Sequence, residues 1–345
     1  MRVLVIGQGI AGTVLAWTLR QRGVQVHVAD AAHPHQSSGV AAGIINPVTG
    51  KRFVKSWRFD DFYTLAQSAY RDMEQALGIR VWHDHSILRL LETPQEKNDW
   101  ALRMATPEYG ALLSEQANAG AWTPLLAPGF SVGVIRSAAR VDFSTLMLQF
   151  RRLALKERWL TQEQWSPQTA RVRVAAGDFD AVVFCEGYRA ALNPLFPGLA
   201  WQLSKGEAMI LRFRAPQAAH IHTEMLKKTM LLAPIGDGLF WAGASYNWAY
   251  DDDGPSEAEQ AFLEARIRPM LGVEYEVLRR MAAVRPTVKD RRPFLGESPI
   301  ERKAFIFNGL GTKGALLAPF WAAHLADHIL EGKALDREVD IQRFR

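Results

Sequence analysis

One short segment at the start of the chain restricts its fold more than any other. Residues 1–6 (MRVLVI) form an apolar, β-branched run that leads directly into the glycine-rich turn 7–12 (GQGIAG). Residues 11–22 then repeat apolar side chains at helical spacing, Gly23 ends that helix, and residues 24–29 form a second strand. A strand, a glycine turn, a helix and a strand in this order predict the first βαβ unit of a dinucleotide-binding fold.

The residues of the glycine turn have separate roles in such a site. Gly7 makes the tight turn, Gly9 lets backbone amides approach a pyrophosphate, and Gly12 lets the helix pack closely on the strand. The helix N-terminus, with residues 10–11, directs its free N–H groups and positive dipole end toward the phosphates. Asp30 follows the second strand, where it would accept hydrogen bonds from ribose hydroxyls. An acid here disfavours the 2′-phosphate of NADP, so NAD and FAD both remain.

Composition limits the class of protein. A chain of 345 residues exceeds what one hydrophobic core usually supports, so we expect two domains. The single cysteine, Cys185, excludes a disulfide framework and a cysteine-rich metal site. No run of about 18 apolar residues is present, and glycines interrupt the N-terminal apolar stretch, so we expect neither a membrane span nor a signal peptide. These features predict a cytoplasmic protein, and its net charge of +5 is typical of a solvated surface.

Two middle segments indicate further strands. Residues 171–187 read as a hairpin, because Val172 and Val174 alternate with polar residues and a turn is expected at Gly177. Residues 201–245 are rich in short apolar runs and tryptophan, which favours an antiparallel sheet.

The C-terminal part repeats the opening pattern. Residues 284–294 are expected to be extended and basic, and 304–308 form a strand. A second glycine turn, 309–314 (GLGTKG), follows that strand and leads into a helix over 315–330. A helix N-terminus at this turn would stabilise negative charge on a bound ligand, and Lys313 either adds to that effect or is simply solvated.

Both ends of the chain resemble the D-amino-acid oxidase and glycine oxidase superfamily of FAD enzymes. The first glycine turn with Asp30 is similar to the family's site for the ADP half of FAD, although most members carry Glu at this position. Residues 41–47 (AAGIINP) are similar to the segment beside the flavin ring, and 182–187 to a strand that ends near the ADP half. Residues 284–287 (VRPT) resemble the segment whose arginine binds the substrate carboxylate, and 309–319 the last flavin-contacting turn and helix.

The resemblance implies an α/β fold with a Rossmann-like FAD-binding domain (GR2-type) and a second, mainly antiparallel β-sheet substrate domain. The FAD-binding domain is expected over 1–78, 138–200 and 285–345, and the substrate domain over 79–137 and 201–284. FAD is favoured over NAD, because this superfamily uses the C-terminal strand, turn and helix against the flavin pyrimidine. The residues expected to bind FAD are Gly7, Gly9, Ile10, Ala11, Gly12, Asp30, Ser38, Ala42, Gly43, Ile44, Gly187, Gly309, Gly311, Thr312, Lys313 and Gly314.

Arg285 and Tyr246 are the expected catalytic residues. A guanidinium can grip a carboxylate with two parallel hydrogen bonds, and Pro286 biases residue 285 toward an extended backbone. Tyr246 offers a hydroxyl or a pocket wall. The resemblance then implies that the C–N bond of a small amino acid or N-substituted amino acid is oxidised by hydride transfer to flavin N5. The resulting imine hydrolyses, and oxygen or another acceptor takes the electrons.

Three other functions stay open at this stage. One is oxidation of a carboxymethylamino group on tRNA, since the FAD domain of a bifunctional wobble-uridine-modifying enzyme belongs to the same superfamily. The basic stretch 51–58 (KRFVKSWR) permits this function, but no recognised RNA-binding module is present, so it is the less favoured alternative. The others are a flavin-binding protein without catalysis and, least favoured, an NAD dehydrogenase.

Histidine pairs with metal-ligand spacing are present but incomplete. His83 and His85 would share one face of a strand, as would the pair at 220 and 222, and His324 lies four residues before His328 on a helix. No third ligand completes any pair, so we expect no metal site.

Overall fold

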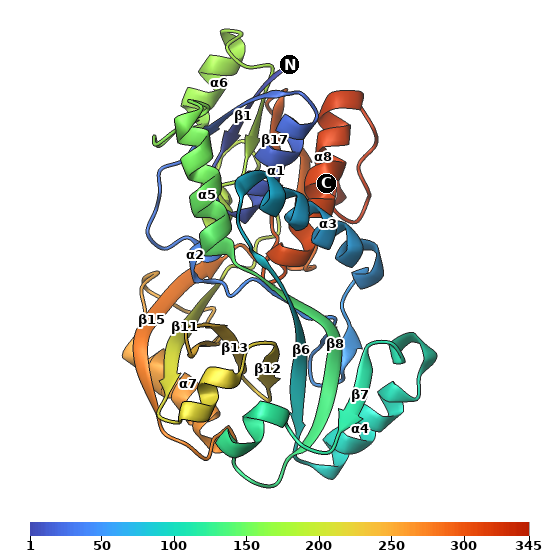
Figure 1. Cartoon of the computed structure of the whole chain (residues 1–345). Coiled ribbons are helices and arrows are strands. Elements are labelled where there is room, and N and C mark those ends of the chain that lie inside the picture. Colours follow the sequence, from blue (N-terminus) through green and yellow to red (C-terminus); the bar gives the residue numbers. More distant parts are fainter. Residues whose placement is uncertain (345) are drawn as a thin grey trace.

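The computed structural model describes residues 1–344, which form two large β-sheets, one above the other in Figure 1, and one small one. Sheet A has six strands in the order β16-β17-β10-β1-β2-β9, all parallel except the edge strand β16. Its strands are β1 (Arg2–Ile6), β2 (Gln25–Ala29), β9 (Leu160–Thr161), β10 (Ala181–Phe184), β16 (Phe294–Glu297) and β17 (Ala304–Asn308). Neighbouring central strands thus come from the first, middle and last parts of the chain.

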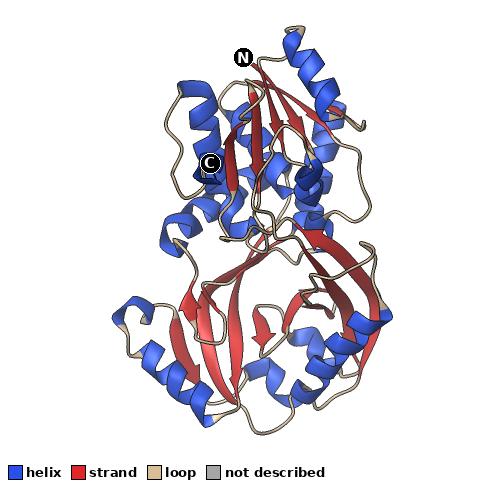
Figure 2. Cartoon of the chain, turned by 180° about the vertical axis from the view of Figure 1, so that it is seen from behind, coloured by secondary structure: helices blue, strands red, loops and turns tan. Residues whose placement is uncertain are grey.

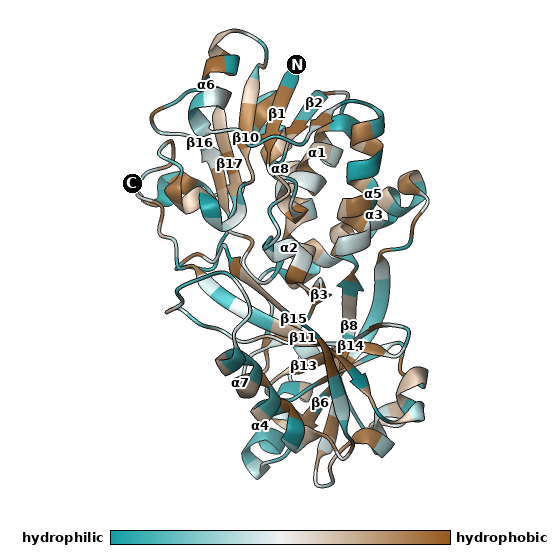
Figure 3. Ribbon diagram, turned by 90° about the vertical axis from the view of Figure 1, so that its left-hand side faces the viewer, coloured by the Kyte–Doolittle hydropathy of each residue, from teal (hydrophilic) through white to brown (hydrophobic). Residues whose placement is uncertain are grey.

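Sheet A is covered by helices on both faces, which explains its nearly continuous apolar strands. In β1, Val3 and Val5 enter one core with α1 and α8, whereas Leu4 and Ile6 enter a second core on the opposite face, beside α6. Figure 3 shows β1, β10 and β17 in the brown of apolar residues between these helices. The helices are α1 (Ile10–Gln21), α2 (Ser37–Val40), α3 (Phe59–Leu77), α4 (Pro94–Met104), α5 (Phe143–Lys156), α6 (Pro167–Ala175), α7 (Glu257–Ile267) and α8 (Gly314–Glu331).

Sheet B is larger and mostly antiparallel; only β12 and β6 pair in parallel. Its order is β15-β11-β14-β13-β12-β6-β8-β3, with β7 also paired to β8. It curls below sheet A, with α4 and α7 on its outer side (Figure 2). Its strands are β3 (Ile44–Ile45), β6 (Trp82–Leu91), β7 (Leu113–Gln116), β8 (Ser131–Val141), β11 (Ser204–Phe213), β12 (Glu224–Lys227), β13 (Leu231–Gly236), β14 (Leu239–Gly243) and β15 (Tyr275–Arg285).

Short elements complete the fold. A two-stranded hairpin joins β4 (Val48–Thr49) and β5 (Val54–Lys55). Six 3₁₀ turns are η1 (Pro107–Tyr109), η2 (Gly120–Leu125), η3 (Gly187–Leu192), η4 (Pro216–His220), η5 (Arg268–Met270) and η6 (Ile341–Phe344). Within residues 1–344, no helix combines the length and the apolarity needed to cross a bilayer.

The predicted fold class is confirmed: a parallel Rossmann-like sheet is joined to a mainly antiparallel sheet. The predicted domain boundaries stay a prediction, and Arg345, the last residue of the range 285–345, lies outside the described residues. The predicted hairpin over 171–187 is wrong in its first half, because Val172 and Val174 lie in α6. Ser166 caps that helix by accepting a hydrogen bond from the Thr169 N–H (3.0 Å), so local capping decides the structure there.

Candidate functional site

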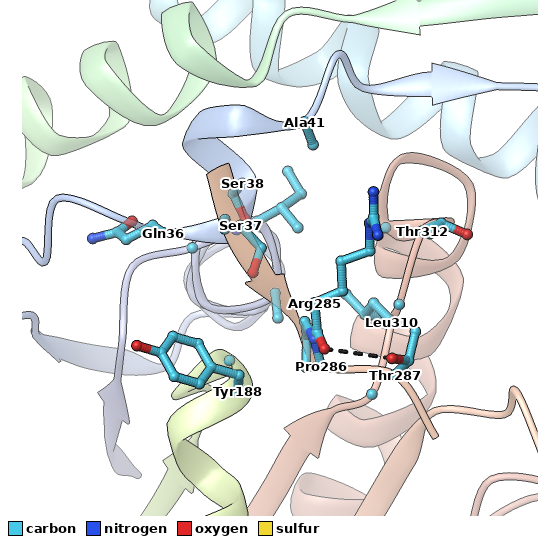
Figure 4. Close-up of a pocket in the computed structure, with 18 of the residues that line it drawn as sticks. Gln36, Ser37, Ser38, Ala41, Tyr188, Arg285, Pro286, Thr287, Leu310 and Thr312 are labelled. Carbon is cyan, nitrogen blue, oxygen red and sulfur yellow. Dashed lines mark hydrogen bonds between the residues drawn. The ribbon is translucent and has the colours of Figure 1, made fainter. Parts of the chain in front are cut away.

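One large cavity lies where the carboxyl ends of the sheet A strands face sheet B. Its volume is about 1570 Å³, and its lining includes the turns after β1, β2, β10 and β17 together with side chains from sheet B. Ligands in open parallel α/β sheets bind at this edge, where the strands end. Figure 4 shows Arg285 at the end of β15, between Ser37 and Ser38 of α2 and the turn that carries Leu310 and Thr312.

The structure brings nearly all the predicted site residues to this one cavity. Gly12 is the exception, because it lies behind the turn and packs α1 on β1. The predicted residues that line the cavity are Gly7, Gly9, Ile10, Ala11, Asp30, Ser38, Ala42, Gly43, Ile44, Gly187, Tyr246, Arg285, Gly309, Gly311, Thr312, Lys313 and Gly314. The first and last parts of the chain therefore form one site.

The first glycine turn has the close backbone approach that the sequence predicts. Gly7 adopts φ = +97°, and a Cβ there would overlap the carbonyl oxygen of Cys185. A Cβ on Gly12 would in turn overlap the carbonyl oxygen of Gly7. Gly9 is the N-cap of α1 and has no side chain to cap the helix, so the Ala11 N–H of the first turn has no partner among the described residues, and Ala11 lines the cavity. The side chain of Ser38 accepts a hydrogen bond from the Ile10 N–H at 3.0 Å.

Asp30 lies at the tip of β2, and protein donors already use most of the hydrogen-bonding capacity of its carboxylate. Its Oδ1 accepts from the Gln8 N–H (2.9 Å), and its Oδ2 accepts from the Ala32 N–H (3.0 Å) and from the Arg151 guanidinium (2.8 Å). Oδ1 keeps one lone pair for a further donor. A hydrogen bond to a ribose hydroxyl therefore stays a prediction, with room for one bond rather than two.

Arg285 projects into the cavity beside Tyr246. Its Nη2 donates to the Ser245 carbonyl oxygen (3.0 Å), and its guanidinium carbon lies 4.2 Å from the centre of the Tyr246 ring. Its Nη1 is buried without a hydrogen-bond partner among the described residues. Burial lowers the pKa of Arg285, and proximity to Tyr246 opposes that change. Gly206 lies directly beneath, where a Cβ would overlap the guanidinium.

Lys313 is half-buried at the start of α8 rather than freely solvated. Its Nζ donates to the Ser56 hydroxyl at 3.3 Å. Burial, with Arg292 and Arg291 nearby, lowers the pKa of Lys313. A cation is thus held where the second glycine turn lines the cavity.

Sequence reasoning missed three polar residues of the site. Arg151 of α5 pairs with Asp30, and Asn308 joins two strand ends by donating from its Nδ2 to the Gly187 carbonyl oxygen (2.9 Å). Lys227 of β12 lines the cavity from sheet B. Alternation along β12 is the only signal that would have placed Lys227 on an inner face.

The histidine pairs form no metal centre in the part of the chain that the structure describes, where no cluster of three metal-binding side chains occurs. His83 and His85 do share β6, and His324 and His328 share α8. The pair at 220 and 222 does not lie on a strand as predicted, since residue 220 ends the 3₁₀ turn η4.

Comparison with known proteins decides the family. The family model described as "DAO: FAD dependent oxidoreductase" matches residues 2–328. The chain belongs to the DAO family of FAD-dependent oxidoreductases. The resemblance at its two ends is confirmed, and FAD rather than NAD is the cofactor of the family.

The proteins that are similar to this chain have names that describe different activities. The tRNA 5-methylaminomethyl-2-thiouridine biosynthesis bifunctional protein MnmC of Marinobacter nauticus is 26% identical over 99% of this chain, which spans 58% of that protein. Glycine oxidase from Geobacillus kaustophilus superposes with a TM-score of 0.76 at 20% identity, covering 97% of both chains. Iminodiacetate oxidase from Chelativorans sp. BNC1 has a TM-score of 0.73 at 20% identity, covering 99% of this chain and 98% of that one.

The residues around the cavity fit FAD. The close backbone approaches at Gly7 and Gly12 hold α1 tightly against β1, and Gly9 leaves the start of α1 without a side chain where a pyrophosphate would meet it. Gly309 repeats this feature at the end of β17, where a Cβ would lie 2.7 Å from Val288 Cγ2. When bound, FAD supplies the hydride acceptor, so the protein has to hold and orient the substrate.

Proposed function

We propose that the protein oxidises the C–N bond of a small amino acid or N-substituted amino acid with FAD as the hydride acceptor. The substrate carbon loses a hydride and its nitrogen loses a proton, so a C=N bond forms. Water then hydrolyses this imine to an amine and a carbonyl compound. Oxygen or another electron acceptor completes the cycle.

The position of Arg285 is the observation that carries this proposal. Its Nη1 is buried without a partner in residues 1–344, and an unpaired buried donor is costly unless a ligand satisfies it. A carboxylate can satisfy it with charge-assisted hydrogen bonds and fix the adjacent amine and carbon in one orientation. The ring of Tyr246 against the guanidinium supports the same orientation.

Anaerobic reduction of the bound flavin tests the proposal. The FAD-loaded protein is mixed without oxygen with glycine, N-alkylglycines, and D- and L-amino acids, and the loss of flavin absorbance is followed. Bleaching by at least one carboxylate-bearing amine is the expected result. A flavin that none of these amines reduces would contradict the proposal and favour a non-catalytic flavoprotein.

A second candidate is oxidation of a carboxymethylamino group on tRNA. The relative named for tRNA 5-methylaminomethyl-2-thiouridine biosynthesis aligns with 99% of this chain. Exposed Lys51 and Arg52 also line the cavity, where they would meet phosphate groups. Adding tRNA that bears the modification to the anaerobic panel tests this candidate. Bleaching by that tRNA alone, lost as salt is raised, would favour it.

Lys313 provides a test of where the cofactor lies. We expect Lys313→Met to lower the midpoint potential of the bound flavin by roughly 30–60 mV, because a nearby cation favours electron uptake and a charged hydrogen bond contributes about 1.5–3 kcal/mol. The potential is measured by dye-coupled spectrophotometric titration. Lys51→Met removes the same charge from an exposed residue of the cavity lining and should leave the potential within a few millivolts. Equal potentials for wild type and Lys313→Met would remove Lys313 from the flavin site.

A further inference from the structure

A second cation lines the cavity at a distance from Arg285. Lys227 is the last residue of β12, and it shares a face of that strand with Met225, which packs into the core between the two sheets. Leu226 points the other way into the outer core of sheet B. Because side chains alternate along a strand, Lys227 faces the cavity, whose lining includes it.

The register of sheet B places Lys227 at the end of a row of small and apolar residues. Ala208 pairs with Gly243, Gly243 with Leu231, and Leu231 with Lys227. Each of these residues lines the cavity. Arg285 bonds to Ser245, just beyond Gly243 on the same chain segment. Lys227 therefore lies two strands, or roughly 10 Å across the sheet, from β14, the strand that leads to the Ser245 carbonyl bonded by Arg285, whereas Arg285 itself ends β15.

Lys227 has no counter-ion among the described residues. In residues 1–344 its ammonium makes no ion pair and no side-chain hydrogen bond, whereas neighbouring Lys228 pairs with Glu92. Arg89 of β6, in register with Lys227, is a second buried cation beside it. Burial and this like charge lower the pKa of Lys227 to about 8. A half-buried, unpaired ammonium beside another cation is costly, and a bound anion would remove the cost.

We propose that Lys227 is a specificity-determining residue that binds a second carboxylate of the substrate. The substrate class is then a secondary amine with an acid group on each side of the nitrogen, as in iminodiacetate. One carboxylate binds Arg285 and the other binds Lys227. The row of Ala208, Gly243 and Leu231 separates the two binding positions. This inference rests on the proposed function, because it assigns the first carboxylate to Arg285.

Binding of non-reacting ligands tests the inference directly. Diglycolate has an ether oxygen in place of the amine and two carboxylates, and methoxyacetate has the same oxygen and one carboxylate. Calorimetric titration of the FAD-loaded protein gives both dissociation constants. Loss of one charged contact predicts that Lys227→Met weakens diglycolate binding roughly 10- to 100-fold and leaves methoxyacetate binding within about twofold. Lys97→Met removes an exposed charge on α4, outside the cavity, and should change neither constant by more than about threefold.

The outcomes separate this inference from the proposed function. Diglycolate binding that is insensitive to Lys227→Met, or an equal loss for both ligands in a variant with full FAD content, would overturn the second carboxylate site. Bleaching of that variant by a monocarboxylate amine would then still support the proposed function. If no amine bleaches the wild-type flavin, the proposed function fails even where diglycolate binding depends on Lys227.

Discussion

Replacing Arg285 with methionine is expected to raise the substrate concentration that half-saturates flavin reduction by about 100-fold or more. Methionine keeps much of the apolar stem but removes both hydrogen bonds to the carboxylate, and each charged bond contributes about 1.5–3 kcal/mol. Stopped-flow measurement of anaerobic flavin reduction against substrate concentration gives this value. An unchanged concentration dependence would show that Arg285 does not bind the carboxylate.

Two further variants separate binding from general damage at Arg285. Arg189→Met removes an exposed arginine of the same cavity and should leave half-saturation within about twofold. Gly206→Val keeps Arg285 but inserts a side chain where its guanidinium lies. We expect Gly206→Val to weaken substrate binding nearly as much as Arg285→Met, because the hydrogen bonds depend on the position of the group as well as on its charge.

Replacing Gly12 with valine is expected to yield colourless, less stable protein. The new Cβ would overlap the Gly7 carbonyl oxygen, so α1 would have to move away from β1 and take the N–H groups of its first turn with it. Overpacking of this kind costs about 1–3 kcal/mol or more. Flavin absorbance relative to protein absorbance, together with the melting temperature, measures both effects.

The matched control for Gly12 is Gly39→Ala. Gly39 lies in α2, and a Cβ there would meet no atom within 4 Å. This variant should keep its FAD and its melting temperature. A yellow Gly12→Val protein with full FAD content would contradict the role assigned to the first glycine turn.

The sequence predicts the structure best where the pattern of adjacent residues alone indicates the element that the fold contains. Strand β1, the glycine turn and α1 follow each other within 21 residues, and the predicted boundaries differ from the observed ones by about one residue. The second glycine turn and α8 were likewise predicted from adjacent residues. Such units are readable because hydrophobic period, glycine placement and helix termination all indicate the same structure.

Features that depend on distant parts of the chain were not predictable from the sequence alone. The partner of Asp30 is Arg151, which is separated from it by 121 residues and lies on an otherwise ordinary amphipathic helix. Lys227 and Lys228 look alike in sequence, and only the register of β12 against β13 assigns one to the cavity. In α6, alternating valines indicated a strand, but the serine cap and the following proline favoured a helix.

The strand order of sheet A determines when the sheet can be completed during synthesis of the chain. Strand β10 lies between β1 and β17, so the middle of the sheet is complete only after residue 308 has been synthesised. A ribosome-bound intermediate ending before β17 would lack both that strand and the wall formed by residues 309–314. We therefore expect capture of the cofactor to be a late event in biosynthesis, because the first glycine turn is made early and the second, which completes the cavity, is made last.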